Sequence, residues 1–126
     1  MRLTLRQLSG RYAVCRLPAD AAAPAPAPGP LWAVVRRAGE VSIVCAESCT
    51  PRGARIERGW SALAVEGPLD FGLVGVLAGL TGCLADAGVP VFAISSFDTD
   101  VLLVQAADLE RAVTTLSDAG HRILAR

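Results

Sequence analysis

The pattern of apolar and polar positions is similar in two parts of the chain, residues 32–45 and residues 92–105. Superimposed without a gap, 60 positions apart, the segments match Trp32 with Phe92 and Glu40 with Asp100, and most of their apolar positions coincide. Each segment consists of two short apolar runs around a polar turn, a pattern typical of a β-hairpin. The sequence therefore predicts two hairpins in a chain built from two related copies.

A further strand is predicted before and after each hairpin. Residues 13–15 correspond to residues 63–65 upstream, and residues 53–56 correspond to residues 120–123 downstream. The offsets of these pairs are 50 and 67, so the second copy holds ten more residues before its hairpin and seven more after it. The extra residues predict two helices that the first copy lacks.

Helical periodicity supports both of these helices. In the second one, Asp108 is a plausible N-cap and Gly120 marks the end. Its apolar stripe consists of Leu109, Ala112, Val113 and Leu116. In the first one, four glycines would share one side of the helix, which predicts a close approach of another backbone. The apolar positions of this first helix are Leu73, Val76, Leu77, Leu80 and Leu84, and the glycines are Gly72, Gly75, Gly79 and Gly82.

These elements predict an α+β fold of two ferredoxin-like βαββαβ units in tandem, the first with reduced helices. Residues 1–59 would form the degenerate unit and residues 60–126 the complete one. In the first unit, residues 19–30 are an alanine and proline tract that cannot be helical, because every second residue from Pro24 to Pro30 lacks an amide donor. We expect an extended loop there, with a proline-rich docking segment as the alternative.

Composition places the chain among globular proteins. Of its 126 residues, 52% are hydrophobic and 19% charged, and twelve basic residues balance twelve acidic ones. This balance argues against a nucleic-acid partner, which would require a basic surface. No signal peptide or apolar run long enough to span a bilayer is found, so we expect a cytoplasmic protein without a membrane partner.

The four cysteines are expected to be reduced thiols. Cys15, Cys45 and Cys83 lie in apolar segments and should be buried, whereas Cys49 lies in a polar turn and should be accessible. Cys45 and Cys49 have no second pair at zinc-ligand spacing, so no metal site is predicted.

The sequence favours a protein that is not an enzyme and has no cofactor. Its single histidine, His121, lies where the last strand should begin, and no serine or cysteine forms a recognisable nucleophile motif with it. Metalloprotease, nucleophile-elbow and phosphate-loop patterns are also missing.

Two segments have the composition of a binding site. Residues 67–73 join a strand to the first helix and would offer backbone amides to an anion, although Asp70 is equally explained as the helix N-cap. Residues 94–100 form the second hairpin turn, whose hydroxyls and carboxylates would bind a cation or simply close the turn. Together the two segments suit a zwitterion.

The βαββαβ pattern resembles the ACT domain, a small-molecule sensor attached to many enzymes of amino-acid metabolism. Residues 40–45, 57–60, 67–71 and 94–100 in particular resemble the stand-alone tandem ACT proteins of bacteria, which are similar in turn to the CASTOR-type arginine sensors of animals. The resemblance covers nearly the whole chain from Gly10. Asp98 and Thr99 depart from the arginine sensors, so arginine is not implied as the ligand.

The resemblance also implies which residues bind the ligand. An acid and a glycine in the strand-to-helix loop, with the two residues that follow, would contact the amino acid from one side. A hydroxyl, an aromatic ring and an acid of the hairpin would contact it from the other, and a strand of the preceding unit would add main-chain contacts. The matching positions are Asp70, Gly72, Leu73 and Val74, then Ser96, Phe97 and Asp100, and finally Ser42 and Ile43.

The function expected from the sequence is a non-catalytic regulatory module that binds a small molecule, which the resemblance implies is an amino acid. The alternative is a protein-interaction subunit whose ligand pocket has decayed. A homo-oligomer, in its simplest form a homodimer, is expected in either case, because a unit without helices leaves one face of its sheet uncovered.

Overall fold

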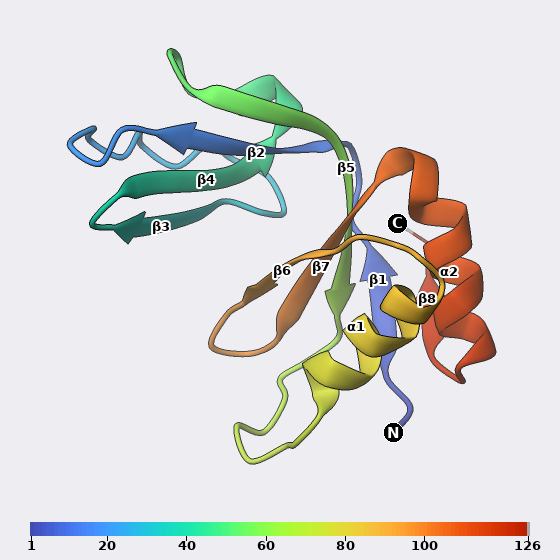
Figure 1. Cartoon of the computed structure of the whole chain (residues 1–126). Helices are drawn as coiled ribbons and strands as arrows, with labels where there is room; N and C mark the ends of the chain where they lie inside the picture. The colour runs from blue at the N-terminus through green and yellow to red at the C-terminus, as the bar shows by residue number, and fades with distance from the viewer. Residues whose placement is uncertain (126) are drawn as a thin grey trace. The chain divides into compact units, whose positions relative to one another are not determined.

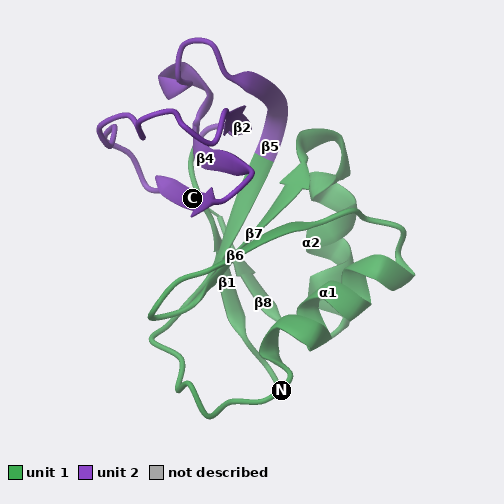
Figure 2. Cartoon of the chain, turned by 60° about the vertical axis from the view of Figure 1, so that its left-hand side comes forward, with its two compact units in different colours: residues 1–9, 61–126 green, residues 10–60 purple. Residues whose placement is uncertain are grey.

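The computed structural model describes residues 1–125, and the chain divides into two compact units (Figure 2). The smaller unit is residues 10–60, and the larger one combines residues 1–9 with the chain from residue 61 onward. Strand β5 (Arg55–Val65) begins in the smaller unit and ends in the larger one. The sequence predicts a division after residue 59, whereas the structure places residues 1–9 with the C-terminal part of the chain.

The larger unit is an α+β sandwich of a sheet and two helices (Figure 1). Its strand order is β6-β7-β5-β1-β8, and the segment from β5 to β8 follows the predicted βαββαβ sequence of elements. The ferredoxin-like fold class is therefore confirmed. The elements are β1 (Thr4–Gln7), α1 (Val76–Asp86), β6 (Phe92–Ser95), β7 (Asp100–Gln105), α2 (Leu109–Asp118) and β8 (Arg122–Leu124), with a 3-10 turn at Ala106–Asp108.

Strand β1 is an additional strand that the sequence analysis did not predict. It lies between β5, to which it is antiparallel, and β8, to which it is parallel. Leu5 pairs with Val65 on one side and Ile123 on the other, and its side chain is fully buried. A four-stranded ferredoxin-like sheet is thereby extended to five strands by the N-terminus of the chain.

Both helices cover the same face of this sheet (Figures 1 and 2). Alternate residues of β1, β5 and β7 point to that face and meet the apolar stripes of α1 and α2. The resulting core comprises Leu5, Leu63, Val65, Val76, Leu80, Leu84, Val89, Leu102, Val104, Ala112 and Leu116.

Helix α1 starts later than its apolar spacing predicts. Gly75 is its N-cap and has a φ of 82°. This left-handed backbone conformation is incompatible with a right-handed helix, so α1 begins only at Val76. Leu73 and Gly72 therefore lie in the preceding loop. A Cβ atom added at Gly79 or Gly82 would meet nothing within 4 Å in the described part of the chain. The prediction of a glycine face packed on another backbone is wrong for this chain by itself.

Helix α2 agrees with its prediction. It begins directly after Asp108, and Gly120, with a φ of 100°, follows its end. The carboxylate of Asp108 does not cap the helix but pairs with Arg111, at 2.9 Å. Ala112 and Leu116 supply its buried stripe.

The smaller unit is an antiparallel sheet with the strand order β3-β4-β2-β5. Its hairpin, β3 with β4, and the β6–β7 hairpin of the larger unit confirm both predicted hairpins. Residues 19–30 form neither helix nor strand, as predicted. Its elements are β2 (Tyr12–Leu17), β3 (Ala33–Arg37), β4 (Glu40–Ala46), a 3-10 turn at Glu47–Cys49 and the first part of β5.

The thiols differ in burial and in acidity. Cys15 and Cys45 are buried, and burial raises the pKa of both, that of Cys45 to about 12. Cys49 is partly exposed, as predicted. Cys83 was expected to be buried but is also partly exposed. It lies on α1 beside the core and not within it, and its Sγ donates to the Thr115 carbonyl oxygen of α2 at 3.6 Å.

Alkylation of the native protein should therefore proceed in two phases. At pH 7.5 we expect Cys49 to react first, Cys83 next, and Cys15 and Cys45 only after unfolding, because a thiolate is required for reaction. Mass spectrometry of time points with iodoacetamide, with and without denaturant, measures this order. Modification of Cys45 at the rate of Cys49 in the native state would contradict it.

No helix among residues 1–125 has the length and apolar character needed to cross a bilayer.

Candidate functional site

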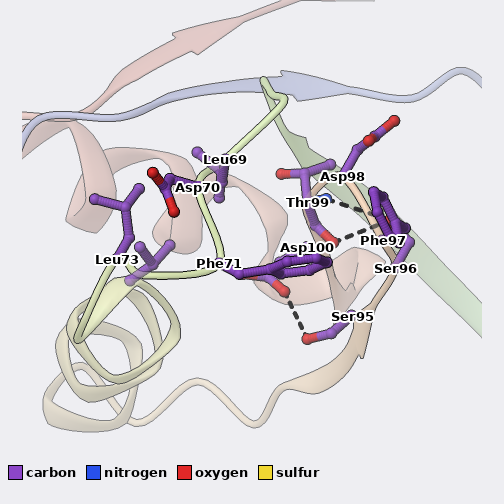
Figure 3. A pocket seen from close by; sticks show the side chains of 11 residues that line it. Leu69, Asp70, Phe71, Leu73, Ser95, Ser96, Phe97, Asp98, Thr99 and Asp100 are labelled. Atoms are coloured by element: carbon purple, nitrogen blue, oxygen red, sulfur yellow. Dashed lines mark hydrogen bonds between the residues drawn. The ribbon is translucent and has the colours of Figure 1, made fainter.

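A hollow of about 240 Å³ lies in the larger unit between the loop that precedes α1 and the turn that joins β6 to β7 (Figure 3). The two segments that form it are those whose composition suggests binding. The lining residues are Leu69, Asp70, Phe71, Leu73 and Val76 from the loop and helix start, and Ser95, Ser96, Phe97, Asp98, Thr99 and Asp100 from the hairpin.

Two hydrogen bonds and one close approach at a glycine hold the two segments together. The Leu69 amide donates to the Asp98 carbonyl oxygen at 2.7 Å, and the Thr99 hydroxyl donates to the Val65 carbonyl oxygen at 2.7 Å. A Cβ atom on Gly67 would lie 3.0 Å from both the Asp98 oxygen and the Thr99 Cβ atom, so any larger residue would push the hairpin turn away by a few tenths of an ångström. The loop is thereby anchored to the hairpin turn.

The hydroxyls of the hairpin participate in local hydrogen bonds. The Ser96 amide and hydroxyl both donate to the Thr99 carbonyl oxygen, at 2.8 and 3.0 Å. The Ser95 hydroxyl donates to Asp100 Oδ1 at 2.6 Å (Figure 3). These bonds close the turn and fix Asp100, whose second carboxylate oxygen keeps its capacity to accept.

Asp70 does not act as the helix N-cap, which is Gly75. Its Oδ1 atom instead accepts a 2.7 Å hydrogen bond from the Gly72 amide, and its carbonyl oxygen accepts one from the Leu73 amide at 3.0 Å. The capping alternative is therefore wrong. The Gly72 amide is also not open to a ligand, because an anion bound there would have to displace the Asp70 carboxylate.

Two phenylalanines form the most exposed part of the hollow. Phe71 reaches from the loop toward the hairpin and meets Phe97 edge to face, with ring centroids 4.8 Å apart (Figure 3). Their exposed fractions are 73% and 79%. The two rings together form a contiguous exposed apolar patch, a feature that is more informative on a monomer than single exposed apolar side chains.

All charged side chains that line the hollow, among the described residues, are acidic. Asp70, Asp98 and Asp100 carry carboxylates, and no residue among 1–125 that lines the hollow is basic. None of the three belongs to an ion pair within residues 1–125. A group with positive charge would therefore be attracted to the hollow.

The structure brings together five of the residues that the resemblance implies, namely Asp70, Leu73, Ser96, Phe97 and Asp100. Gly72 is hydrogen-bonded to this set, whereas Val74 is 88% exposed and does not line the hollow. Ser42 and Ile43 belong to the smaller unit, where Ile43 is fully buried and Ser42 donates to the Glu40 carboxylate.

Six lining residues were not assigned a role from the sequence. Five of them lie inside the two segments that the analysis identified, so reading each segment as a whole would have found them. Val76 could not be found in this way, because its place at the rim depends on where α1 starts. The six are Leu69, Phe71, Val76, Ser95, Asp98 and Thr99.

The described residues include no group of three or more histidine, cysteine or acidic side chains that could hold a metal ion. His121 lies outside the hollow, where its Nδ1 atom accepts a 3.1 Å hydrogen bond from the Leu3 amide. Burial and the N-terminal ammonium group lower the pKa of His121 below its ordinary value of 6.5. The neutral imidazole thus accepts a hydrogen bond that links the residue before β8 to the residue before β1.

This histidine should make stability depend on pH. Because its pKa is lower in the folded state, we expect the free energy of unfolding to fall as pH drops through 6.5 toward the folded-state value, when the unfolded state binds the proton more readily. Urea titrations at pH 7.5 and 5.5 measure the effect. His121→Asn keeps an acceptor but does not titrate, so a pH dependence equal to wild type in that variant would contradict the assignment.

Comparison with known proteins identifies the family. The family model described as the ACT domain matches residues 55–118, from β5 to the end of α2. Comparison with curated protein sequences gives no match.

Solved structures agree with that match. Protein Atu0741 of Agrobacterium tumefaciens is 35% identical, with a TM-score of 0.92 over 100% of this chain and 95% of its own. A Vibrio cholerae protein of unknown function is 19% identical, with a TM-score of 0.67 over 92% of this chain and 88% of its own.

The fold also occurs within a larger enzyme. An aspartate kinase of Clostridium acetobutylicum is 13% identical, with a TM-score of 0.65 over 91% of this chain and 33% of its own. At this identity the likeness concerns the fold alone. Together with a family model that matches half of the residues, these findings show that the chain belongs to the ACT domain family.

Proposed function

We propose that this chain is a non-catalytic regulatory module that binds an amino acid in the hollow between residues 69–76 and residues 95–100. The observation that carries the proposal is that two separate segments, each with the composition of a binding site, line one hollow. The family supports it, because ACT domains are regulatory ligand-binding modules. The C. acetobutylicum aspartate kinase, which shares the fold, is itself an allosteric enzyme of amino-acid production.

The chemistry of the lining suits an amino acid in two respects. The α-ammonium group would pair with the carboxylates of Asp70 and Asp100, which form no ion pair in the described chain. The α-carboxylate would accept from the Gly72 amide once Asp70 turns from that amide toward the ammonium group. The ligand side chain would pack against the rings of Phe71 and Phe97.

Ser42 and Ile43 remain proposed contacts of this ligand through their main-chain atoms. Strand β4, which carries them, matches the hairpin of the larger unit in sequence, and both hairpins are present as antiparallel pairs. The tandem origin of the two units is part of the proposal.

A thermal-shift screen with the twenty amino acids tests the proposal. A ligand present at 100 times its dissociation constant should stabilise the protein by about 2.7 kcal/mol. For a chain of this length, that corresponds to a rise in melting temperature of roughly 8–12 °C. Calorimetry should then give one site per chain for the amino acid that produces the shift, and no shift with any amino acid would reject this ligand class.

One observation favours the second candidate function, a protein-interaction subunit whose pocket no longer binds a ligand. Four large apolar side chains are exposed around the hollow, and exposed clusters of this kind mark interaction surfaces. They are Phe71, Leu73, Val74 and Phe97. A protein that fails the ligand screen but associates through these side chains would support this candidate.

A further inference from the structure

Strand β3 of the smaller unit carries exposed side chains of two kinds. Val34 and Val35 are 38% and 52% exposed, and the two residues that follow them, Arg36 and Arg37, are exposed as well. None of these four side chains lines the hollow of the larger unit. The strand is therefore a separate surface that the proposed function does not use.

The backbone of β3 is an open edge of its sheet. Among residues 1–125, the strand pairs with β4 alone. Arg37 and Glu40 flank the two-residue turn as a pair, so the alternation of an antiparallel ladder directs the N–H and C=O groups of Val34 and Arg36 away from β4. No other backbone group of the described chain pairs with them. Such a row of unpaired donors and acceptors is suited to the addition of one more strand.

Two guanidinium groups are held in place at the end of this strand. That of Arg36 donates to the carbonyl oxygens of Ala19 and Ala21, at 3.0 and 2.9 Å. That of Arg16, on β2, donates to the carbonyl oxygen of Gly39 in the turn after β3, at 3.1 Å. All three acceptors are neutral, so these bonds position the two positive charges without neutralising them.

No acid compensates the positive charge of this edge. Arg16, Arg36 and Arg37 belong to no ion pair within residues 1–125. The smaller unit has seven arginines and four acidic residues, a net charge of +3. Charged side chains on an edge strand prevent pairing with strands of like charge and favour strands of opposite charge. A second copy of β3 contains no acid, so it does not supply the missing charge.

We propose that β3 binds an extended acidic segment of a partner protein, which adds to the sheet of the smaller unit as a further antiparallel strand. Antiparallel addition continues the direction of the pairs that β4 forms with β2 and β3. Hydrogen bonds to the outward backbone groups of β3 provide the affinity, and the side chains of the added strand provide the selectivity.

The order of residues along β3 specifies the sequence of the segment. In an antiparallel pair, two acidic residues followed by two apolar ones place the acids opposite Arg37 and Arg36 and the apolar residues opposite Val35 and Val34. Side chains directly opposite each other lie on the same face of the sheet, where pairs of opposite charge and apolar pairs are favourable. The expected partner therefore contains an acid-acid-apolar-apolar segment in extended form.

Two peptides of identical composition test this order. Gly-Thr-Glu-Glu-Val-Val-Thr-Gly has the required order, and Gly-Thr-Val-Val-Glu-Glu-Thr-Gly has the reverse. In an NMR titration of the full chain, the first peptide should shift the amide signals of residues 33–37 and slow hydrogen exchange at Val34 and Arg36. The second peptide should bind about fivefold more weakly, because an antiparallel arrangement places its acids opposite the valines.

A proline at position 34 tests the addition of a strand. Val34→Pro removes one outward donor and leaves the hydrogen bonds to β4 intact, as edge strands tolerate. It should weaken binding of the first peptide about tenfold, because one hydrogen bond is lost and the ring obstructs the added strand. Val34→Thr, the matched control, keeps the amide donor and the β-branched shape and should bind within about twofold of the wild type. Circular dichroism verifies that both variants are folded.

A charge reversal tests the selectivity without altering the backbone. Arg37→Glu should weaken binding of the first peptide about fivefold and strengthen binding of its counterpart Gly-Thr-Lys-Lys-Val-Val-Thr-Gly. Arg52→Glu changes the net charge of the smaller unit equally, at an exposed position outside β3, and should leave both affinities near those of the wild type. Equal losses in the two variants would show that net charge alone attracts the peptide.

Other results would also overturn the proposal. They are equal binding of the two peptide orders, unchanged affinity in Val34→Pro, and no binding of the first peptide at concentrations up to about 1 mM. A wild-type dimer that Val34→Pro dissociates would assign the edge to a second copy of the chain instead. The thermal-shift screen with amino acids is performed without peptide, so the proposed function and this proposal fail separately.

Discussion

Replacing Leu5 by alanine should destabilise the protein by about 2–5 kcal/mol, as expected for a fully buried leucine that leaves a cavity. The residue lies on β1 between β5 and β8 and belongs to the core that both helices cover. Because domains of this kind are stable by only about 5–15 kcal/mol, the loss is a large part of the total. Urea denaturation followed by circular dichroism measures it.

A leucine at an exposed position provides the control. Leu73 is 44% exposed, and Leu73→Ala should change the free energy of unfolding by less than about 1 kcal/mol. If Leu5→Ala were as mild as this control, the N-terminal strand would not be an integral part of the larger unit.

Asp100→Asn and Asp70→Asn should each weaken binding of the amino acid found in the ligand screen at least tenfold. A charge-assisted hydrogen bond to an ammonium group contributes about 2–3 kcal/mol, which a neutral amide cannot supply. Asparagine keeps the oxygen that accepts from Ser95 at position 100 and from Gly72 at position 70, so both turns should persist. Calorimetry measures affinity, and thermal melting verifies that each variant is folded.

Asp86→Asn and Asp118→Asn are the matched controls, because both carboxylates are exposed at helix ends and neither lines the hollow. They should bind the ligand like the wild type. Unchanged affinity in both Asp70→Asn and Asp100→Asn would place the ligand elsewhere, and equal losses in the controls would indicate only a long-range effect of net charge.

The fold could be predicted where two parts of the sequence resemble each other or where several signals in one segment agree. The two hairpins and helix α2 were found because matched segments, apolar spacing and a terminal glycine all agreed. Strand β1 has no counterpart elsewhere in the chain, and only one of its four residues, Leu5, is fully buried. The alternation of leucine and arginine in residues 1–10 was the available signal, but one buried position is too weak a pattern to define a strand.

The start of α1 illustrates a different limit. Leu73 lies at helical spacing from Leu77 and Leu80, but periodicity does not reveal that Gly75 adopts a positive φ and starts the helix later. The contacts within the site also depend on a loop conformation that the sequence pattern does not reveal. Both segments were identified from composition, whereas the contact between Phe71 and Phe97 depends on how the loop folds against the hairpin.

The position of β1 has a consequence for the order in which the protein can fold during synthesis. This strand is synthesised before every other described element, but its partner β8 is the last of them, and Thr4 of β1 pairs with Arg122 of β8. Residues 10–60, by contrast, contain all the strand partners of their own sheet and can pair as soon as they emerge. Strand β1 can pair with β5 before β8 has been made, but it gains its second neighbour only when β8 has been synthesised, after every other element described here.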